Sequence, residues 1–263
     1  NTSTNMIDFQ AIVNSYPPSL RPFRRFLLRE YLQCKILSLL FRQPETAARL
    51  CFLGGTCLSL VHGNRRFSED LDFDNRGLKE ADFDEATRQV KTGLEEEGYE
   101  VTIKNVMKGA WRCSIRFPGL LFQAGLSGHV EESILIQVDM QPQQFDYSPE
   151  SYLLNRFDLF LEIAVTPLDL LLAQKCYAIF NRNRAKGRDF YDAVFLFGKT
   201  APNYAYLAQK TGIADAEAMK TKLLETCQQL DMAALAEDVK PFLFDPNDAL
   251  RVSRFEAFIR QAL

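Results

Sequence analysis

The sequence is poor in the residues that soft-metal and disulfide sites require. Histidine occurs only twice, at His62 and His129, which excludes a three-histidine metal site and leaves carboxylates as the available hard ligands. The six cysteines are scattered through hydrophobic segments without a CxxC pair. We therefore expect reduced thiols in the core rather than disulfides or zinc ligands.

Long apolar runs and an excess of positive charge are also missing. No apolar stretch reaches the roughly 18 residues that span a bilayer, and the N-terminal NTSTNMIDFQ has neither the basic start nor the apolar core of a signal peptide. A cytoplasmic protein without membrane association is expected. The net charge of -3 argues against a general nucleic-acid coat, so any contact with RNA must be a local patch.

The hydrophobic pattern predicts an α+β chain of 263 residues. Apolar residues at helical spacing predict helices over 23–42 and 80–97, the second ending at Gly98. Short strands are predicted over 70–73, 99–104, 111–117 and 134–139. From Thr166 and Pro167 onward the pattern is helical, which places a boundary near residue 165.

Two aspartates, Asp70 and Asp72, are predicted on the strand over 70–73. Alternate residues of a strand project from one face, so the two carboxylates would lie close together and require a cation. Mg²⁺ fits, because it prefers oxygen ligands and is commonly held by one or two carboxylates together with substrate phosphates. A solvated strand end is the alternative for a bare DxD. A calcium loop is excluded, because its sixth and twelfth positions hold Asn75 and Ala81 instead of Gly and Glu.

A glycine turn precedes these aspartates. Gly54 and Gly55 let the backbone approach a phosphate, the amides at the start of the following helix point toward an anion, and Thr56 adds its hydroxyl. Alone, this segment could be a helix entry with Thr56 as its cap. With the DxD downstream it predicts a triphosphate cradle beside a metal pair, as nucleotidyl transfer requires.

A third carboxylate, Asp139, ends the alternating strand over 134–139. On a neighbouring strand it could complete a two-metal site and help to activate an attacking hydroxyl. An equal alternative is a cap on the turn before Gln141 and Pro142.

The C-terminal third adds a lysine, a basic cluster and two aspartates. Lys175 lies in the apolar helix LDLLLAQKCYAIF, where the residues alone favour a side chain that snorkels to solvent. The densest basic cluster follows, and could meet a triphosphate, an RNA backbone or only a helix C-terminus: Arg182, Arg184, Lys186 and Arg188. Asp189 and Asp192 begin the next helix, where capping and dipole compensation are the simplest interpretation.

Two motifs give the chain a resemblance to a known family. The segments GGTCLSLVHGNRRFSEDLDF, ending at residue 73, and KCYAIFNRNRAKGRDFYDAVFLF, over 175–197, resemble those of the AbiEii/AbiGii-type nucleotidyltransferase toxins of the DNA polymerase beta-like superfamily. The first motif indicates the wider superfamily, whereas the lysine, basic run and RDxYD of the second are typical of this branch.

The resemblance implies a fold and a set of site residues. It implies a helical segment over 1–50, a nucleotidyltransferase core with a small mixed sheet flanked by helices over 51–165, and a helical C-terminal domain over 166–263. Asp70 and Asp72, with Asp139 as a candidate third ligand, would bind Mg²⁺ or Mn²⁺. Gly54, Gly55, Thr56, Lys175 and Arg188 would bind the nucleotide. Lys175 and Asp189 would be required for activity.

The resemblance also implies a reaction and partners. The enzyme would transfer a nucleoside monophosphate from an NTP to an acceptor hydroxyl, foremost at the 3′ end of tRNA, with release of pyrophosphate. It would be a toxin of a toxin–antitoxin or phage-defence system, with an antitoxin encoded nearby. A protein or small-molecule acceptor, or a non-catalytic module that binds nucleotide or antitoxin, are the alternatives.

Overall fold

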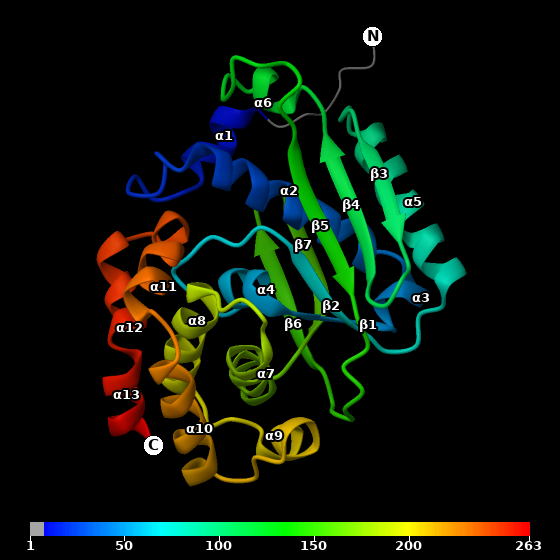
Figure 1. Cartoon of the computed structure of the whole chain (residues 1–263). Coiled ribbons are helices and arrows are strands. Elements are labelled where there is room, and N and C mark those ends of the chain that lie inside the picture. Colours follow the sequence, from blue (N-terminus) through cyan, green and yellow to red (C-terminus); the bar gives the residue numbers. More distant parts are fainter. Residues whose placement is uncertain (1–7) are drawn as a thin grey trace. The chain divides into compact units, whose positions relative to one another are not determined.

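The computed structural model describes residues 8–263, so most of the N-terminal decamer considered above lies outside the described residues. Contacts divide this part of the chain into two compact units (Figure 1). The first unit comprises residues 8–57, 68–144 and 149–165, and the second comprises 58–67, 145–148 and 166–263. The sequence placed one boundary near 165. The structure adds that two internal segments, 58–67 and 145–148, pack with the second unit.

The first unit is built on a 7-stranded mixed sheet in the order β3-β4-β5-β2-β1-β7-β6 (Figure 1). The β2–β5 and β1–β7 pairs are parallel and the other neighbours are antiparallel. The predicted mixed sheet flanked by helices is therefore confirmed. The strands are β1 (Leu50–Leu53), β2 (Leu71–Asn75), β3 (Thr102–Val106), β4 (Trp111–Phe117), β5 (Ile134–Met140), β6 (Glu150–Arg156) and β7 (Leu159–Val165).

Helix α2 forms the core of the first unit together with one face of the sheet. It packs on α5, β5 and β7, and the predicted helix over 23–42 is confirmed within a residue at each end. On β5 the predicted alternation holds, because Ile134, Ile136 and Val138 are buried. The helices of this part are α1 (Phe9–Asn14), α2 (Arg24–Phe41), α3 (Pro44–Ala47), α4 (Gly54–Leu60), α5 (Glu80–Glu96) and α6 (Leu120–Gln123). The chain passes from the first unit into the second within α4.

The hairpin of β6 and β7 was absent from the predicted elements. Arg156 pairs with Leu159, which leaves Phe157 and Asp158 as a two-residue turn. Phe157 has a φ of 55°, a left-handed conformation that usually signals itself in a sequence by Gly or Asn. Without that signal, the sequence over 150–165 does not mark the point at which one strand ends and the next begins.

The second unit is helical, as predicted for residues after Thr166. Helices α7 and α8 pack together, α11 and α12 pack on α8, and α10 packs on α7 and α13. Its helices are α7 (Leu168–Asn181), α8 (Gly187–Phe197), α9 (Tyr204–Thr211), α10 (Ala216–Gln228), α11 (Met232–Val239), α12 (Leu250–Ser253) and α13 (Phe255–Ala262), with 3-10 turns at Lys240–Phe242 and Pro246–Ala249. Helix α11 was not predicted.

Two simpler expectations concern cysteine and membranes. All six cysteines are buried free thiols, so the predicted reduced core cysteines are confirmed. Among residues 8–263, no helix combines the length and hydropathy needed to cross a bilayer.

Candidate functional site

The glycine turn and the paired-aspartate strand meet at Gly54 and Asp72. Gly54 has a φ of +80°, and a Cβ placed on it would lie 2.3 Å from Asp72 Oδ2. The register explains this approach, because Leu53 of β1 pairs with Asp72 of β2 and the turn begins at the next residue. Glycine is therefore required here twice, by its backbone conformation and by the carboxylate that occupies the space of a side chain.

Thr56 connects the same two segments. It is buried, at 1% exposure, and its hydroxyl donates to the carbonyl oxygen of Asp70. Asp70 itself precedes β2, which begins at Leu71. The observed hydrogen bond of Thr56 thus anchors the start of the aspartate strand, and contact between this hydroxyl and a phosphate stays a prediction.

Asp72 belongs to a row of charged side chains that crosses three strands. In the register, Asp139 of β5 pairs with Asp72 of β2 on one side and with Arg112 of β4 on the other. The next residue along β2, Phe73, packs against Phe41 of α2, with ring centroids 6.1 Å apart and the ring planes tilted by 45°. Because successive strand residues face opposite ways, the charged row lies on the face of the sheet turned away from α2.

Arg112 donates hydrogen bonds to both carboxylate oxygens of Asp139. Its Nε lies 2.6 Å from Oδ1 and its Nη2 lies 2.9 Å from Oδ2, the fork geometry that arginine forms with a carboxylate. These hydrogen bonds and the charge of Asp139 raise the pKa of Arg112, with smaller contributions from Asp70 and Asp72. A guanidinium cation therefore occupies the end of the acidic row.

The donors of this row suit a hard divalent cation held by Asp70 and Asp72. The glycine turn leaves space for the Asp72 carboxylate. One or two carboxylates are the usual protein ligands of Mg²⁺ when substrate phosphates supply further oxygens. Among residues 8–263, however, no three acidic, histidine or cysteine side chains are grouped so as to hold an ion. The three-carboxylate set with Asp139 stays a prediction, while the structure pairs Asp139 with Arg112.

Replacement of Gly54 by alanine tests whether the turn is shaped around Asp72. Gly109 is a matched control, because its φ of +79° is equally left-handed but no atom lies within 4 Å of the place that a Cβ would take there. Both substitutions should lower the unfolding free energy by about 1–2 kcal/mol through backbone strain. Only Gly54→Ala should also displace Asp72 and lower nucleotide transfer about tenfold or more. Equal transfer activity in the two variants would show that the approach of Gly54 to the Asp72 carboxylate is not needed for nucleotide transfer.

In the second unit, Lys175 lies between two aspartates of helix α8. Its Nζ is 3.0 Å from Asp189 Oδ1 and 2.8 Å from Asp192 Oδ2, and only 13% of the side chain is exposed. Asp189 and Asp192 are three apart on one helix, so both face α7. The expectation of a snorkelling lysine, drawn from the residues alone, is wrong, because this ammonium has buried partners.

Asp192 is the centre of a buried polar network. Arg66 donates to both of its oxygens at 2.6 Å, Asn64 Nδ2 donates to Oδ1 at 2.7 Å, and Lys175 completes the set. The side chains of Arg66 and Asp192 are 2% and 0% exposed. The expectation that Asp192 only compensates the dipole at a helix start is wrong. Asp189 is the acidic residue in the first turn of α8, the N-cap is Lys186, and Asp192 lies beyond that turn.

The charges of this network reinforce one another. Burial alone would raise the pKa of Asp192, but Arg66 and Lys175 outweigh it and hold that pKa at about 2. Burial alone would lower the pKa of Lys175, but Asp192 and Asp189 leave it raised. Lys175 is therefore an ammonium at physiological pH, which suits it to neutralise charge and excludes it as a general base.

The segment that carries Arg66 is fixed in the second unit by main-chain bonds as well. Phe67 N donates to Phe242 O at 2.8 Å, and Phe244 N donates to Arg65 O at 3.2 Å. The connection between the glycine turn and β2 is thus anchored on the unit that contains Lys175.

In the basic cluster between α7 and α8, some side chains contact other residues of the second unit and others are exposed to solvent. Arg182 Nε lies 2.8 Å from Asp189 Oδ2, and the Arg188 guanidinium lies 4.7 Å from the centre of the Phe242 ring. Arg184 is exposed. Arg188 as a nucleotide ligand stays a prediction.

Comparison with known proteins identifies the family. The family described as the nucleotidyl transferase AbiEii toxin of a type IV toxin–antitoxin system matches residues 38–261. The chain belongs to this family. Membership makes the protein a nucleotidyltransferase toxin, and implies an NTP substrate and an antitoxin encoded nearby.

Solved structures agree with the fold of this AbiEii-family chain. The crystal structure of JHP933 from Helicobacter pylori is 18% identical, with a TM-score of 0.55 over 90% of this chain and 92% of that one. A second structure, "Crystal structure of putative nucleotidyltransferase from H. pylori", has the same identity and TM-score over 90% of this chain and 95% of that one. A comparison with curated proteins found no match.

Sequence reasoning on the AbiEii-family chain missed the partners of its key residues. Arg66 was contained in the RFSEDLDF motif but given no role, and Arg112 had no signal beyond its place on a strand. The structure brings Asp72, Asp139 and Gly54 together within the first unit, and Lys175 and Asp189 together within the second.

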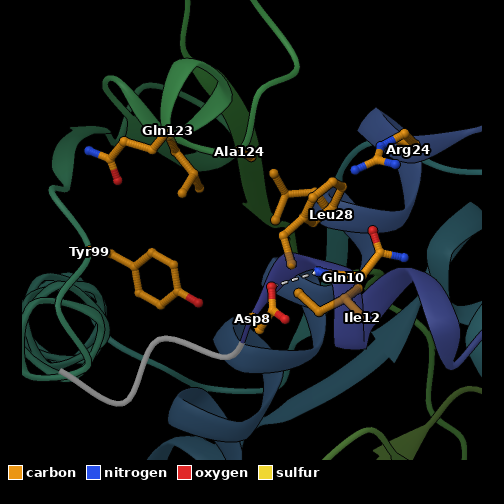
Figure 2. Close-up of a pocket in the computed structure, with 10 residues that line it drawn as sticks. Asp8, Gln10, Ile12, Arg24, Leu28, Tyr99, Gln123 and Ala124 are labelled. Atoms are coloured by element: carbon orange, nitrogen blue, oxygen red, sulfur yellow. Dashed lines mark hydrogen bonds between the residues drawn. The ribbon is translucent and has the colours of Figure 1, made fainter. Parts of the chain in front are cut away.

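A separate cavity of about 390 Å³ lies in the first unit, between α1, α2 and α6 (Figure 2). Its lining combines apolar side chains with polar ones: Leu28, Ile12, Tyr99, Arg24 and Asp8. The Asp8 carboxylate accepts a hydrogen bond from Gln10 N. None of the predicted AbiEii site residues lines it.

Proposed function

We propose that this AbiEii-family enzyme transfers a nucleoside monophosphate from an NTP to a terminal hydroxyl of RNA, foremost tRNA. The acceptor oxygen would bond to the α-phosphorus while the bond to the β-phosphate bridging oxygen breaks. Pyrophosphate would leave with that electron pair, and the hydroxyl proton would pass to solvent. The observation that carries the proposal is the glycine turn closed around Asp72 in a chain of this family.

Asp70 and Asp72 are proposed to hold the catalytic cation, Mg²⁺ or Mn²⁺. When bound, the cation would neutralise the phosphate oxygens and orient the α-phosphate for in-line displacement. Gly54 and Gly55 would let the backbone come close to the phosphates, and the absence of a side chain at Gly54 leaves room for the Asp72 carboxylate. Thr56 would keep Asp70 in place through its hydrogen bond.

Lys175 is proposed to stabilise the charge that builds on the leaving pyrophosphate. Its raised pKa keeps it cationic, and a fixed cation of this kind acts without reorganisation during the reaction. Asp189 would orient Lys175 through the contact of 3.0 Å.

The basic residues of the segment 182–188 support a polyanionic acceptor such as RNA. The chain as a whole is acidic, yet the segment 182–188 contains four basic residues, of which Arg184 is exposed and Lys186 partly so. Such a local patch attracts an RNA backbone without making the protein a general nucleic-acid binder.

The test is transfer of label from each α-labelled NTP in the presence of Mg²⁺ and total tRNA. Label should appear in tRNA, and nuclease digestion should place it at the 3′ end. Labelled protein or small molecule, with unlabelled RNA, would overturn the RNA acceptor while keeping the transferase. Nucleotide binding without transfer to any acceptor would overturn the proposed reaction.

Lys175→Met tests the proposed role of the ammonium. The rate constant kcat should fall roughly 10²- to 10³-fold with a smaller change in KM, as when a fixed stabilising group is removed. Lys199→Met is the control in the same unit, because Lys199 is exposed and should change kcat by less than about twofold. A variant with normal kcat and a raised KM would show that Lys175 binds substrate without assisting the reaction.

A further inference from the structure

The pairing of Arg112 with Asp139 bears on the number of cations that the carboxylates on β2 and β5 can hold. Arg112, Asp139 and Asp72 occupy one row across β4, β5 and β2. Asp139 is the position at which a third metal-binding carboxylate was expected, and both of its oxygens accept hydrogen bonds from Arg112. A second divalent ion would need an oxygen of Asp139 that now faces a guanidinium.

The geometry of the pair is that of a stable contact. The contacts of 2.6 Å and 2.9 Å are parallel, and the planar fork of arginine loses little conformational freedom in making them. The Asp139 side chain is 22% exposed and that of Arg112 is 49% exposed. The outer part of the guanidinium thus remains accessible while its Nε edge is fixed.

Electrostatics point the same way. The charges of Asp70 and Asp72 also act on Arg112, so the guanidinium lies within the field of all three carboxylates. A second divalent cation without its own carboxylate would be repelled by both the first ion and Arg112.

We propose that Arg112 permanently neutralises Asp139, so that the site takes one divalent cation on Asp70 and Asp72 and Arg112 stands where a second metal would. Arg112 is then a positioning residue, which holds Asp139 away from the cation and keeps a fixed positive charge beside the nucleotide phosphates. The inference rests on the proposed function, because it assumes the cation at Asp70 and Asp72.

The experiment is Mn²⁺ binding to the full chain, measured by electron paramagnetic resonance of the free ion. The variants form a double-mutant cycle, Arg112→Gln, Asp139→Asn and both together, with Asp72→Asn to identify the proposed ion. Arg112→Lys keeps the charge without the fork and checks that effects follow charge rather than folding. Circular dichroism verifies that each variant is folded.

Wild type should bind one Mn²⁺, lost in Asp72→Asn. Arg112→Gln should bind Mn²⁺ at least ~5-fold more tightly, Asp139→Asn should bind it several-fold more weakly, and Arg112→Lys should stay near wild type. The combined variant should return to within about twofold of wild type, because a neutral pair has been removed as a unit.

Two other results separate the failure of this inference from the failure of the proposed function. If wild type binds two ions, or if the combined variant loses an ion or tenfold in affinity, Asp139 is a metal ligand and the role of Arg112 is overturned. If wild type shows no Mn²⁺ binding that depends on Asp72, the proposed cation site itself is overturned, and with it the mechanism.

Discussion

Asp192→Asn should lower the free energy of unfolding by roughly 3–5 kcal/mol, the cost of leaving buried charges without their partner. Arg66, which is 2% exposed, and Lys175, which is 13% exposed, would both lose the carboxylate that now receives them. An amide is the same size, so no cavity is created and the loss reports the charges. Urea unfolding of the full chain, followed by circular dichroism, measures the change.

The matched control is Glu256→Gln, which removes the carboxylate of an exposed ion pair in the same unit. On helix α13, Arg260 Nη2 lies 2.7 Å from Glu256 Oε1, and the two side chains are 54% and 41% exposed. The expected change is within about 0.5 kcal/mol, because solvent screens such pairs. Similar losses in the two variants would contradict the view that the Asp192 network is a buried structural core.

Acid should weaken the folded state through the same carboxylate. The pKa of Asp192 is about 2 in the folded protein against an ordinary value of 3.8, so the folded state binds its proton less readily than the unfolded state. The stability from Asp192 is therefore fully present above about pH 4 and is lost as the pH falls toward 2. Asp192→Asn should flatten this part of the pH dependence, measured as the urea midpoint between pH 5 and 2.

Asp70→Asn combined with Asp72→Asn should abolish transfer of label to RNA, with a loss of at least ~10³-fold. Each carboxylate contributes to the proposed cation site, and removal of one electrostatic group in an active site already costs about 10²- to 10³-fold. Single turnover with excess enzyme measures the chemical step. Transfer that survives in the double variant would contradict the whole mechanism.

Asp74→Asn is the control for this pair of substitutions. Asp74 lies on the same strand, is 4% exposed and accepts a hydrogen bond of 2.9 Å from Gln143 N. An asparagine oxygen can accept the same bond, so the strand should be preserved and activity should fall less than about threefold. A loss as large as that of the double variant would show that the strand, rather than the pair Asp70 and Asp72, is what transfer requires.

Periodic elements were predictable from the sequence, and elements marked only by an unusual turn were not. The helix over 23–42 and the strand ending at Asp139 follow from apolar spacing, because one face of each is buried. The β6–β7 hairpin escaped because its turn is formed by Phe157 and Asp158. Most of the candidate site residues could be named from two motifs, although their partners could not.

The sequence by itself determined the kinds of chemistry available to this protein. Two histidines and no paired cysteines leave carboxylates, a glycine turn and a few basic residues, and the order of the motifs places the turn at Gly54 before the strand with Asp72. Only the tertiary structure decided which charges meet. Arg66 and Asp192 are 126 residues apart, and Arg112 and Asp139 are 27 apart. Such pairs depend on strand register and helix packing, which local spacing does not encode. The glycine turn and the aspartates after it could therefore be named in advance, whereas the approach of Gly54 to Asp72 and the arginines that pair with Asp139 and Asp192 could be found only in the folded chain.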